Sequence, residues 1–276
     1  MAVDPLRERR PAGRDTPKAG IEPAVPVDGR IDRTLTGDAR PGCLTVPPRM
    51  LPGPTRRDNV PSGIVDASEP SDPGLRVVAI VPVGTLDGAK SRLGEVLDAE
   101  ERHDLVTRLT RRTIAAAVAA RSITETLVIT PDDAVRALAL EAGARPMRQR
   151  SQGLNDGLRE AREEAKAAGA DAVLIIPVDL PRITPAAIDA VVGALGSVSP
   201  PLVAMVPDRH GRGTNALLLA PPDVIDVRFG GDSRAAHAAA AAAAGASLTE
   251  LGGPLALDLD TADDLLLVQR AEALGV

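Results

Sequence analysis

Aromatic side chains are almost absent from this 276-residue sequence, which has no Trp, no Tyr and a single Phe, Phe229. Proteins that hold single-stranded nucleic acid without sequence preference stack the bases on several aromatic rings, so this class is excluded. The formal net charge of −6 also provides no basic surface for nucleic acid or for an anionic membrane. The composition therefore predicts neither nucleic acid nor a membrane as a partner.

Cysteine is equally scarce, because Cys43 is the only one. A lone cysteine forms no intrachain disulfide, which excludes a disulfide-stapled secreted scaffold. His103, His210 and His237 lie far apart and lack cysteine partners, which argues against a zinc site. No apolar run approaches the roughly 18 residues that cross a bilayer, and the start MAVDPLRERR lacks the apolar core of a signal peptide. We expect a soluble cytoplasmic protein.

The composition changes sharply near residue 75. Residues 1–74 hold 13 of the 25 prolines and 8 of the 25 glycines, with 11 basic and 11 acidic side chains and no repeat. That composition is typical of disorder. We therefore expect a disordered extension over 1–74 and one folded domain over 75–276. The extension is either a regulatory or partner-binding arm or a dispensable one, including an over-extended start with Met50 as the alternative.

From residue 76 onward, apolar runs alternate with helical patterns. The continuous, β-branched runs predict strands buried on both faces, over 77–83, 126–130, 172–178, 202–206 and 215–220. Helices are expected over 98–120, 131–143, 155–168, from 184 onward, 235–244 and 262–273. Asp98 with Glu101 predicts a capping box, and Thr184 predicts a further N-cap. This alternation predicts an α/β domain with a mixed, mostly parallel sheet.

The loop over 84–93, after the first strand, is the first candidate site. Its small residues allow close approach to a phosphate, and Lys90 and Arg92 supply positive charge. The loop nearly spells a P-loop, but Ala89 replaces the second glycine and Gly94 interrupts the segment before any helix. An ordinary solvated turn is the other alternative. Binding of a phosphate by this loop is the favoured interpretation.

Asp179 is the second candidate site, and Asp258 with Asp260 is the third. Asp179 ends a buried strand, where ligands of open α/β sheets bind. Since Thr184 already fills the role of helix cap, a metal ligand is the favoured interpretation of Asp179. Asp258 and Asp260 are two apart, so on a strand they face the same side and can share one Mg²⁺. The alternative is that Asp260 or Thr261 merely caps the last helix.

Two glycine-containing loops in the carboxyl-terminal half favour anion binding. The loop over 207–215 carries two arginines, two glycines, Thr214 and Asn215 between two predicted strands. The segment over 229–234 opens the alanine-rich helix, where backbone N–H groups and the Ser233 hydroxyl suit an anion. Together with the dispersed aspartates, these loops favour Mg²⁺-assisted phosphoryl or nucleotidyl transfer.

Six segments occur in one order between residues 89 and 265: AKSRL, GLNDGL, PVDLPRIT, DRHGRGTNALLL, FGGDSRAAH and LDLDTADDL. In this set the sequence resembles the phospholactate/phosphoenolpyruvate guanylyltransferases of coenzyme F-420 biosynthesis. The resemblance implies a single Rossmann-like nucleotidyltransferase domain of the nucleotide-diphospho-sugar transferase type. It also implies GTP as donor, a small phosphorylated carboxylic acid as acceptor, Mg²⁺, and a downstream transferase that takes the product.

The site residues implied by the resemblance follow its motifs. They are Thr214, Gly230 and Ser233 for phosphoenolpyruvate, Lys90, Arg92 and Asn155 for the nucleotide, Asp179, Asp258 and Asp260 for the metal, and Lys90 with Asp179 for catalysis. The long extension departs from the family, and Gly231-Asp232 leaves the fine acceptor specificity open. Two other functions stay open: a nucleotidyltransferase that uses CTP or a sugar phosphate, and a non-catalytic nucleotide-binding module.

Overall fold

The computed structural model describes residues 74–86 and 90–273. The extension predicted over 1–74 falls outside these residues except for Gly74, and so does Ala89. The strands are β1 (Val77–Pro82), β2 (Glu125–Thr130), β3 (Arg145–Arg148), β4 (Ala172–Ile175), β5 (Leu202–Pro207), β6 (Thr214–Ala220) and β7 (Ser247–Glu250). The α-helices are α1 (Ala99–Ala119), α2 (Asp133–Glu141), α3 (Leu154–Ala167), α4 (Pro185–Val192), α5 (Ser233–Ala243) and α6 (Ala262–Ala273). Short 3-10 helices are η1 (Ser91–Leu93), η2 (Gly193–Gly196) and η3 (Pro254–Ala256).

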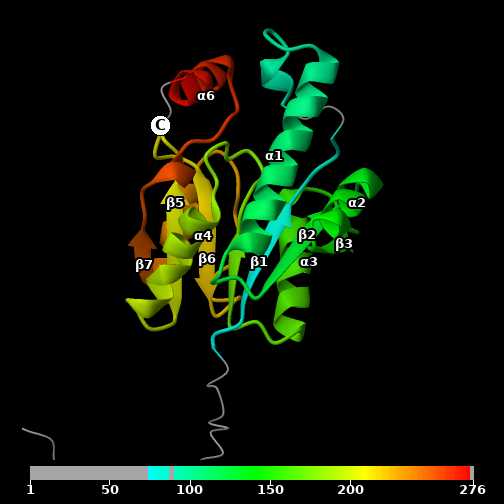
Figure 1. The fold of residues 1–276 in the computed structure, drawn as a ribbon. Coiled ribbons are helices and arrows are strands. Elements are labelled where there is room, and N and C mark those ends of the chain that lie inside the picture. Colours follow the sequence, from blue (N-terminus) through cyan, green and yellow to red (C-terminus); the bar gives the residue numbers. More distant parts are fainter. Residues whose placement is uncertain (1–73, 87–89, 274–276) are drawn as a thin grey trace, which may run out of the picture. The chain divides into compact units, whose positions relative to one another are not determined.

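The strands of the described chain form one sheet in the order β3-β2-β1-β4-β6-β5-β7 (Figure 1). Strand β6 is antiparallel to β4 and β5, and the other neighbouring pairs are parallel. The predicted mixed, mostly parallel sheet is confirmed. Strand β1 pairs with β2 on one side and β4 on the other, so the order of the sheet switches there. Such a switch point opens a crevice at the carboxyl ends of the two strands.

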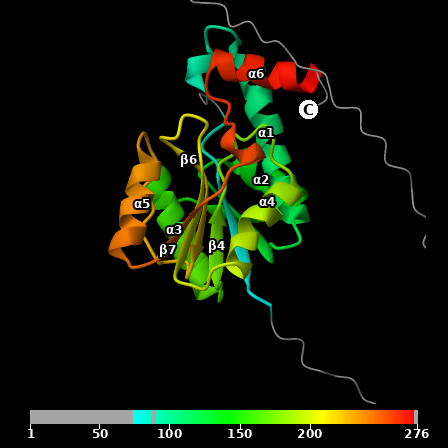
Figure 2. The same cartoon turned by 90° about the vertical axis from the view of Figure 1, so that its left-hand side faces the viewer.

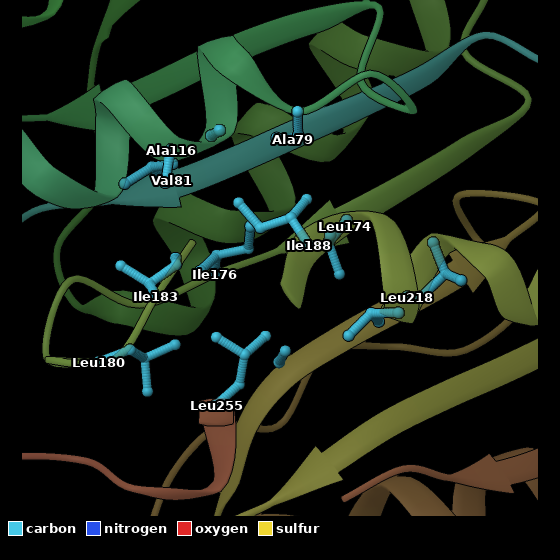
Figure 3. Close-up of a cluster of buried hydrophobic side chains, with 14 of the residues drawn as sticks. Ala79, Val81, Ala116, Leu174, Ile176, Leu180, Ile183, Ile188, Leu218 and Leu255 are labelled. Atoms are coloured by element: carbon cyan, nitrogen blue, oxygen red, sulfur yellow. The ribbon is translucent and has the colours of Figure 1, made fainter. Parts of the chain in front are cut away.

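Helices cover both faces of the sheet (Figure 2). On one face, Ala79 and Val81 pack with side chains from α1, α2 and α4; Figure 3 shows part of this cluster. On the other face, Val78 and Ile80 pack with α3 and α5. Side chains alternate along a strand, so β1, buried on both faces, needs a continuous apolar run. That is why its sequence predicts the strand so clearly.

A third, smaller cluster lies beyond the sheet, where α6 lies near the start of α1 (Figure 1). It contains Leu93, Leu105 and Leu109 together with Leu259 and Val268. Leu93 and Leu259 are almost fully buried. Since Leu93 lies three residues after Lys90, and Leu259 separates Asp258 from Asp260, burial of these leucines brings both segments to one place.

The predicted helix starts are largely confirmed. Asp98 and Glu101 form the reciprocal capping box, with N···O distances of 2.9 and 2.8 Å. The Thr184 hydroxyl accepts from the Ala187 N–H at 3.1 Å, as expected of an N-cap. Helix α2, expected from 131, begins at Asp133 because the Asp132 side chain caps it. In the described part of the chain, no helix combines the length and apolarity that crossing a bilayer requires.

The strand predictions need three corrections. Strand β4 ends at Ile175 and not at 178. The segment over 257–260 is not a strand. Strands β3 and β7 were not predicted, because each has four residues, lies at an edge of the sheet and lacks an apolar run. An edge strand is recognised by pairing partners that are distant in sequence, which local periodicity does not reveal.

Candidate active site

Lys90 lies at the centre of a cluster built from three distant segments. Its ammonium donates to Asp179 Oδ2 at 3.0 Å and to Asp260 Oδ1 at 2.5 Å. Lys90 follows β1 and Asp179 follows β4, so both lie at the switch point of the sheet. The Lys90 side chain is only 13% exposed, so its two ion pairs are partly shielded from solvent.

The backbone holds the two halves of this carboxylate cluster together. The Leu259 N–H donates to the Asp179 carbonyl oxygen at 2.9 Å. Because the Leu259 side chain is buried in the third cluster, its neighbours Asp258 and Asp260 stay beside Asp179. The two aspartates thus lie on a hydrogen-bonded loop and not on a strand.

Thr261 and Asp264 form the cap of α6. The side chain of Asp260 is therefore not the helix cap that was the alternative to its role as a metal ligand. The Thr261 N–H and hydroxyl both donate to Asp264 Oδ2, at 2.7 and 2.8 Å. The Asp264 N–H donates back to Thr261 Oγ1 at 3.3 Å. Asp260 gives only its backbone N–H to this cap, at 3.0 Å, and its carboxylate pairs with Lys90.

Asp264 also ties this segment to the loop between β5 and β6. Its buried carboxylate forms an ion pair with Arg209 of that loop. Burial alone would raise the pKa of Asp264, but the hydrogen bonds from Thr261 and Asp260 and the charge of Arg209 lower it. The carboxylate therefore stays ionised and holds the backbone of Asp260 in place.

The charges in the Lys90 cluster do not balance. Burial opposes the charge on Lys90, but Asp179 and Asp260 outweigh it and raise the pKa of the ammonium. Burial raises the pKa of Asp258, and the charges of Asp179 and Asp260 raise it further.

Lys90 also has a left-handed backbone, with φ of +56°, which costs a non-glycine residue roughly 1 kcal/mol or more.

The cluster fits a divalent cation by its chemistry. Asp179, Asp258 and Asp260 bring three carboxylates and Lys90 one ammonium, which leaves surplus negative charge, and carboxylate oxygens are ligands that Mg²⁺ prefers. Over 74–86 and 90–273, no three acidic, histidine or cysteine side chains are already arranged as a metal site. The Lys90 ammonium pairs with both Asp179 and Asp260 and so neutralises part of this negative charge.

The described part of the 84–93 loop differs from a P-loop. Lys90 is followed by η1, and α1 begins only at Ala99, behind the cap formed by Asp98. A P-loop runs directly into a helix whose first N–H groups hold the phosphates. Arg92 lies on η1 with an exposed side chain and makes no hydrogen bond or ion pair with another described residue.

A second polar centre surrounds the start of α5. Buried Thr214, at the start of β6, contacts His237 Nδ1 through its hydroxyl oxygen at 3.1 Å. Ser233 is buried one helical turn before His237. Gly230 has φ of +149°, a backbone conformation that favours glycine. The Ser233 N–H donates to the Gly230 carbonyl at 3.2 Å, and Thr214 contacts the same helix through His237.

Backbone N–H groups are concentrated at this centre. The amides of Gly230, Gly231, Asp232 and Ala235 donate to no other residue that the structure describes. The side chain of Asp232, the N-cap residue, forms no cap and pairs with Arg212 at 3.0 Å. Free N–H groups at the positive end of a helix dipole are well suited to an anion.

Asn155 lies at this second centre and not at the Lys90 cluster. Its amide nitrogen donates to the Phe229 carbonyl at 3.0 Å, and its amide oxygen accepts from the Phe229 N–H at 2.7 Å. Both ends of the side chain thus hold the loop that contains Gly230. Asn155 therefore shapes this loop, and the nucleotide contact that the resemblance implies for it stays a prediction.

The family model described as "Guanylyl transferase CofC like" matches residues 77–269. The chain belongs to this CofC-like guanylyl transferase family. A phosphoenolpyruvate guanylyltransferase of Sphaerobacter thermophilus is 44% identical over 192 residues, which cover 69% of this chain and 91% of the relative. A protein of the same name from Rubrobacter xylanophilus is 41% identical over 202 residues, covering 73% and 96%.

The CofC-like fold also occurs among solved structures. A Desulfovibrio desulfuricans protein described as a nucleotide-diphospho-sugar transferase superposes with a TM-score of 0.59 at 19% identity. The match covers 72% of this chain and 88% of that one. The predicted nucleotidyltransferase fold is confirmed, and the CofC-like chain is an enzyme of the nucleotidyltransferase class.

Two contacts of the CofC-like site were not predicted from the sequence: the ion pair of Arg209 with Asp264 and the contact of His237 with Thr214. Arg209 and Asp264 pair across 55 positions of the chain, and no local pattern announces such a contact. His237 was considered only as a zinc ligand. Its spacing of four residues from Ser233 was the available signal, because residues i and i+4 share one face of a helix.

Proposed function

We propose that this enzyme transfers GMP from GTP to phosphoenolpyruvate, or to 2-phospholactate, and releases diphosphate. The observation that carries the proposal is the adjacency of two centres at the start of β6. Thr214 belongs to the anion-suited centre at α5, and the side chain of the next residue, Asn215, donates to the Leu255 carbonyl at 3.0 Å and partly offsets the rise in the pKa of Asp258 that burial causes. Neighbouring residues of β6 therefore contact the two centres, the anion site at α5 and the Lys90 cluster with its carboxylates. Two adjacent centres of this kind suit a reaction that joins two phosphates.

The reaction requires positioning more than it requires a strong base. A phosphate oxygen of the acceptor attacks the α-phosphorus of GTP, a new P–O–P bond forms, and the bond to diphosphate breaks. A phosphate monoester is already largely dianionic at pH 7, since its second pKa is about 6. The main barrier is the approach of two anions, so orientation and charge neutralisation supply most of the catalysis.

Each centre has one task in this mechanism. The free N–H groups at the start of α5, with the hydroxyls of Thr214 and Ser233, would bind and orient the acceptor anion. Lys90, whose ammonium stays protonated, would neutralise charge on the donor phosphates, with Arg92 as a second contact. Bound by Asp179, Asp258 and Asp260, Mg²⁺ would supply charge stabilisation at the reacting phosphates.

The substrates are proposed from the relatives. The two relatives above carry the name phosphoenolpyruvate guanylyltransferase, which specifies both the donor base and the acceptor. We further propose a place in coenzyme F-420 biosynthesis, where a downstream transferase would consume the activated product. Residues 75–276 would form the catalytic domain, acting in the cytoplasm. The competing proposal is a related enzyme that uses CTP or a sugar phosphate.

Release of diphosphate measures this function directly. Full-length protein is incubated with Mg²⁺ and phosphoenolpyruvate, with either GTP or CTP as donor. We expect diphosphate at a rate at least tenfold higher with GTP, a discrimination of about 1.4 kcal/mol, and none without acceptor. A preference for CTP would support the competing proposal. Binding of GTP without diphosphate release, with any phosphorylated acid tried, would show a non-catalytic nucleotide-binding module.

A further inference from the structure

His237 is buried between two parts of the acceptor centre. Its side chain has no exposed surface and lies on α5, one turn after Ser233. One ring nitrogen, Nδ1, lies 3.1 Å from the Thr214 hydroxyl, and the other, Nε2, lies 3.0 Å from the Arg228 backbone nitrogen. Both ring nitrogens are therefore engaged, and neither faces solvent.

The contact with Arg228 determines which nitrogen carries the proton. A backbone N–H only donates, so Nε2 must be the nitrogen with the free lone pair. Burial lowers the pKa of His237 to about 4, helped by the nearby charge of Arg228 and opposed by Asp226. The ring is neutral at pH 7, and its one proton is on Nδ1, where it donates to Thr214 Oγ1.

This donation determines what the Thr214 hydroxyl offers to a ligand. A hydroxyl has one proton and two lone pairs, and the bond from His237 occupies a lone pair. The proton of Thr214 is then available for an anion. With the opposite tautomer, the Thr214 hydroxyl would donate its proton to His237. Only its oxygen lone pairs would then face a negative ligand, and they would repel that ligand.

We propose that His237 is a positioning residue, which fixes the Thr214 hydroxyl as a donor to the phosphate or carboxylate of the acceptor. This inference rests on the proposed function, because only that function places the acceptor at Thr214. His237 also anchors the neighbouring loop, since it accepts from Arg228 and stands edge-on to Phe229, with ring centres 5.2 Å apart. The two roles belong to different ring nitrogens and can be separated.

Two substitutions separate the role of Nδ1, which positions the Thr214 hydroxyl, from the role of Nε2, which anchors the loop. In His237→Gln, the amide reaches the former Nε2 position, accepts from the Arg228 N–H and removes the donor to Thr214. In His237→Asn, the shorter amide lies near the former Nδ1 position, donates to Thr214 and removes the loop anchor. We expect His237→Gln to raise the acceptor KM about tenfold, the effect of a hydrogen bond to a charged group, without changing the Kd for GTP. His237→Asn should restore most of the acceptor affinity.

The decisive comparison uses Thr214→Val, which removes the hydroxyl but keeps the shape. If His237 acts through Thr214, His237→Gln raises the acceptor KM in the wild type but adds less than about twofold in the Thr214→Val background. Effects that multiply in the double variant would show a structural role instead and overturn the proposal. If Thr214→Val alone leaves the acceptor KM unchanged, the acceptor site of the proposed function is wrong, and the two failures are thereby distinguished.

A spectroscopic measurement covers the case in which the variants fold poorly. Long-range ¹H–¹⁵N spectra of the wild-type imidazoles report which ring nitrogen is protonated. We expect one histidine, His237, to remain neutral with its proton on Nδ1 between pH 6 and 8. A proton on Nε2 of that ring would overturn the proposal whatever the variants do.

Discussion

Asp179→Asn is expected to lower turnover by about a hundredfold or more, equivalent to roughly 2.7 kcal/mol of transition-state stabilisation. The substitution keeps the shape and an oxygen acceptor for Lys90, which lies 3.0 Å away, but it removes one negative charge from the proposed metal ligands. The Asp179 side chain is 27% exposed, so loss of its ion pair should change the free energy of unfolding by only about 1 kcal/mol. Initial rates of diphosphate release and urea unfolding measure the two quantities separately.

Asp263→Asn is the matched control for this prediction. Asp263 lies on α6, three residues after Asp260, and its exposed side chain makes no described hydrogen bond or ion pair. Its substitution removes the same charge from the same region and should leave turnover unchanged. A chelator should silence the wild type, and added Mg²⁺ should restore it. If Asp179→Asn retains more than about a tenth of the wild-type rate, Asp179 is not a principal ligand.

Ser233→Ala should weaken binding of the acceptor, whereas Lys90→Met should weaken binding of GTP. Ser233 is buried at the start of α5 beside the free N–H groups, so loss of its hydroxyl should raise the acceptor KM ten- to hundredfold. This range corresponds to one hydrogen bond to a charged oxygen, about 1.5–3 kcal/mol. The Kd for GTP should change little. Lys90→Met removes the ammonium but keeps the apolar stem, and should weaken GTP binding by a similar factor.

Titration of each variant with GTP alone, followed by acceptor saturation at fixed GTP, gives the two affinities separately. Ser247→Ala is the control for the serine substitution, because Ser247 is exposed on the edge strand β7. If Ser233→Ala weakens GTP and spares the acceptor, the assignment of donor and acceptor to the two centres is inverted. If Lys90→Met binds GTP as well as the wild type, Lys90 serves the carboxylates and not the donor.

Most of the fold could be predicted because its signals are local. The run over 77–83 is apolar at every position, as a strand buried between two helical layers requires. The caps formed by Asp98 and Thr184 depend on residues only three positions apart. Strand β3, with the sequence RPMR, has no such signal, because its pairing with β2 determines its structure.

The individual residues of the site could be predicted from the sequence, but their contacts with one another could not. Asp179, Asp258 and Asp260 were identified by their positions at the ends of extended segments, yet the bridging of Asp179 and Asp260 by Lys90 joins segments 89 and 170 positions apart. Such a contact depends on the strand order, which short motifs do not specify. The contact of Asn155 with Phe229 was not predicted for the same reason, because the two residues lie 74 positions apart.

The most direct test of the account is product identification by mass spectrometry. The full-length protein is incubated with GTP and Mg²⁺, and phosphoenolpyruvate, 2-phospholactate and 3-phosphoglycerate are supplied in parallel reactions. The account predicts a product that joins the acceptor phosphate to GMP through a diphosphate bond, formed from phosphoenolpyruvate or 2-phospholactate, together with one diphosphate per product. A guanylylated product from 3-phosphoglycerate alone, or no guanylylated product from any acceptor, would contradict it.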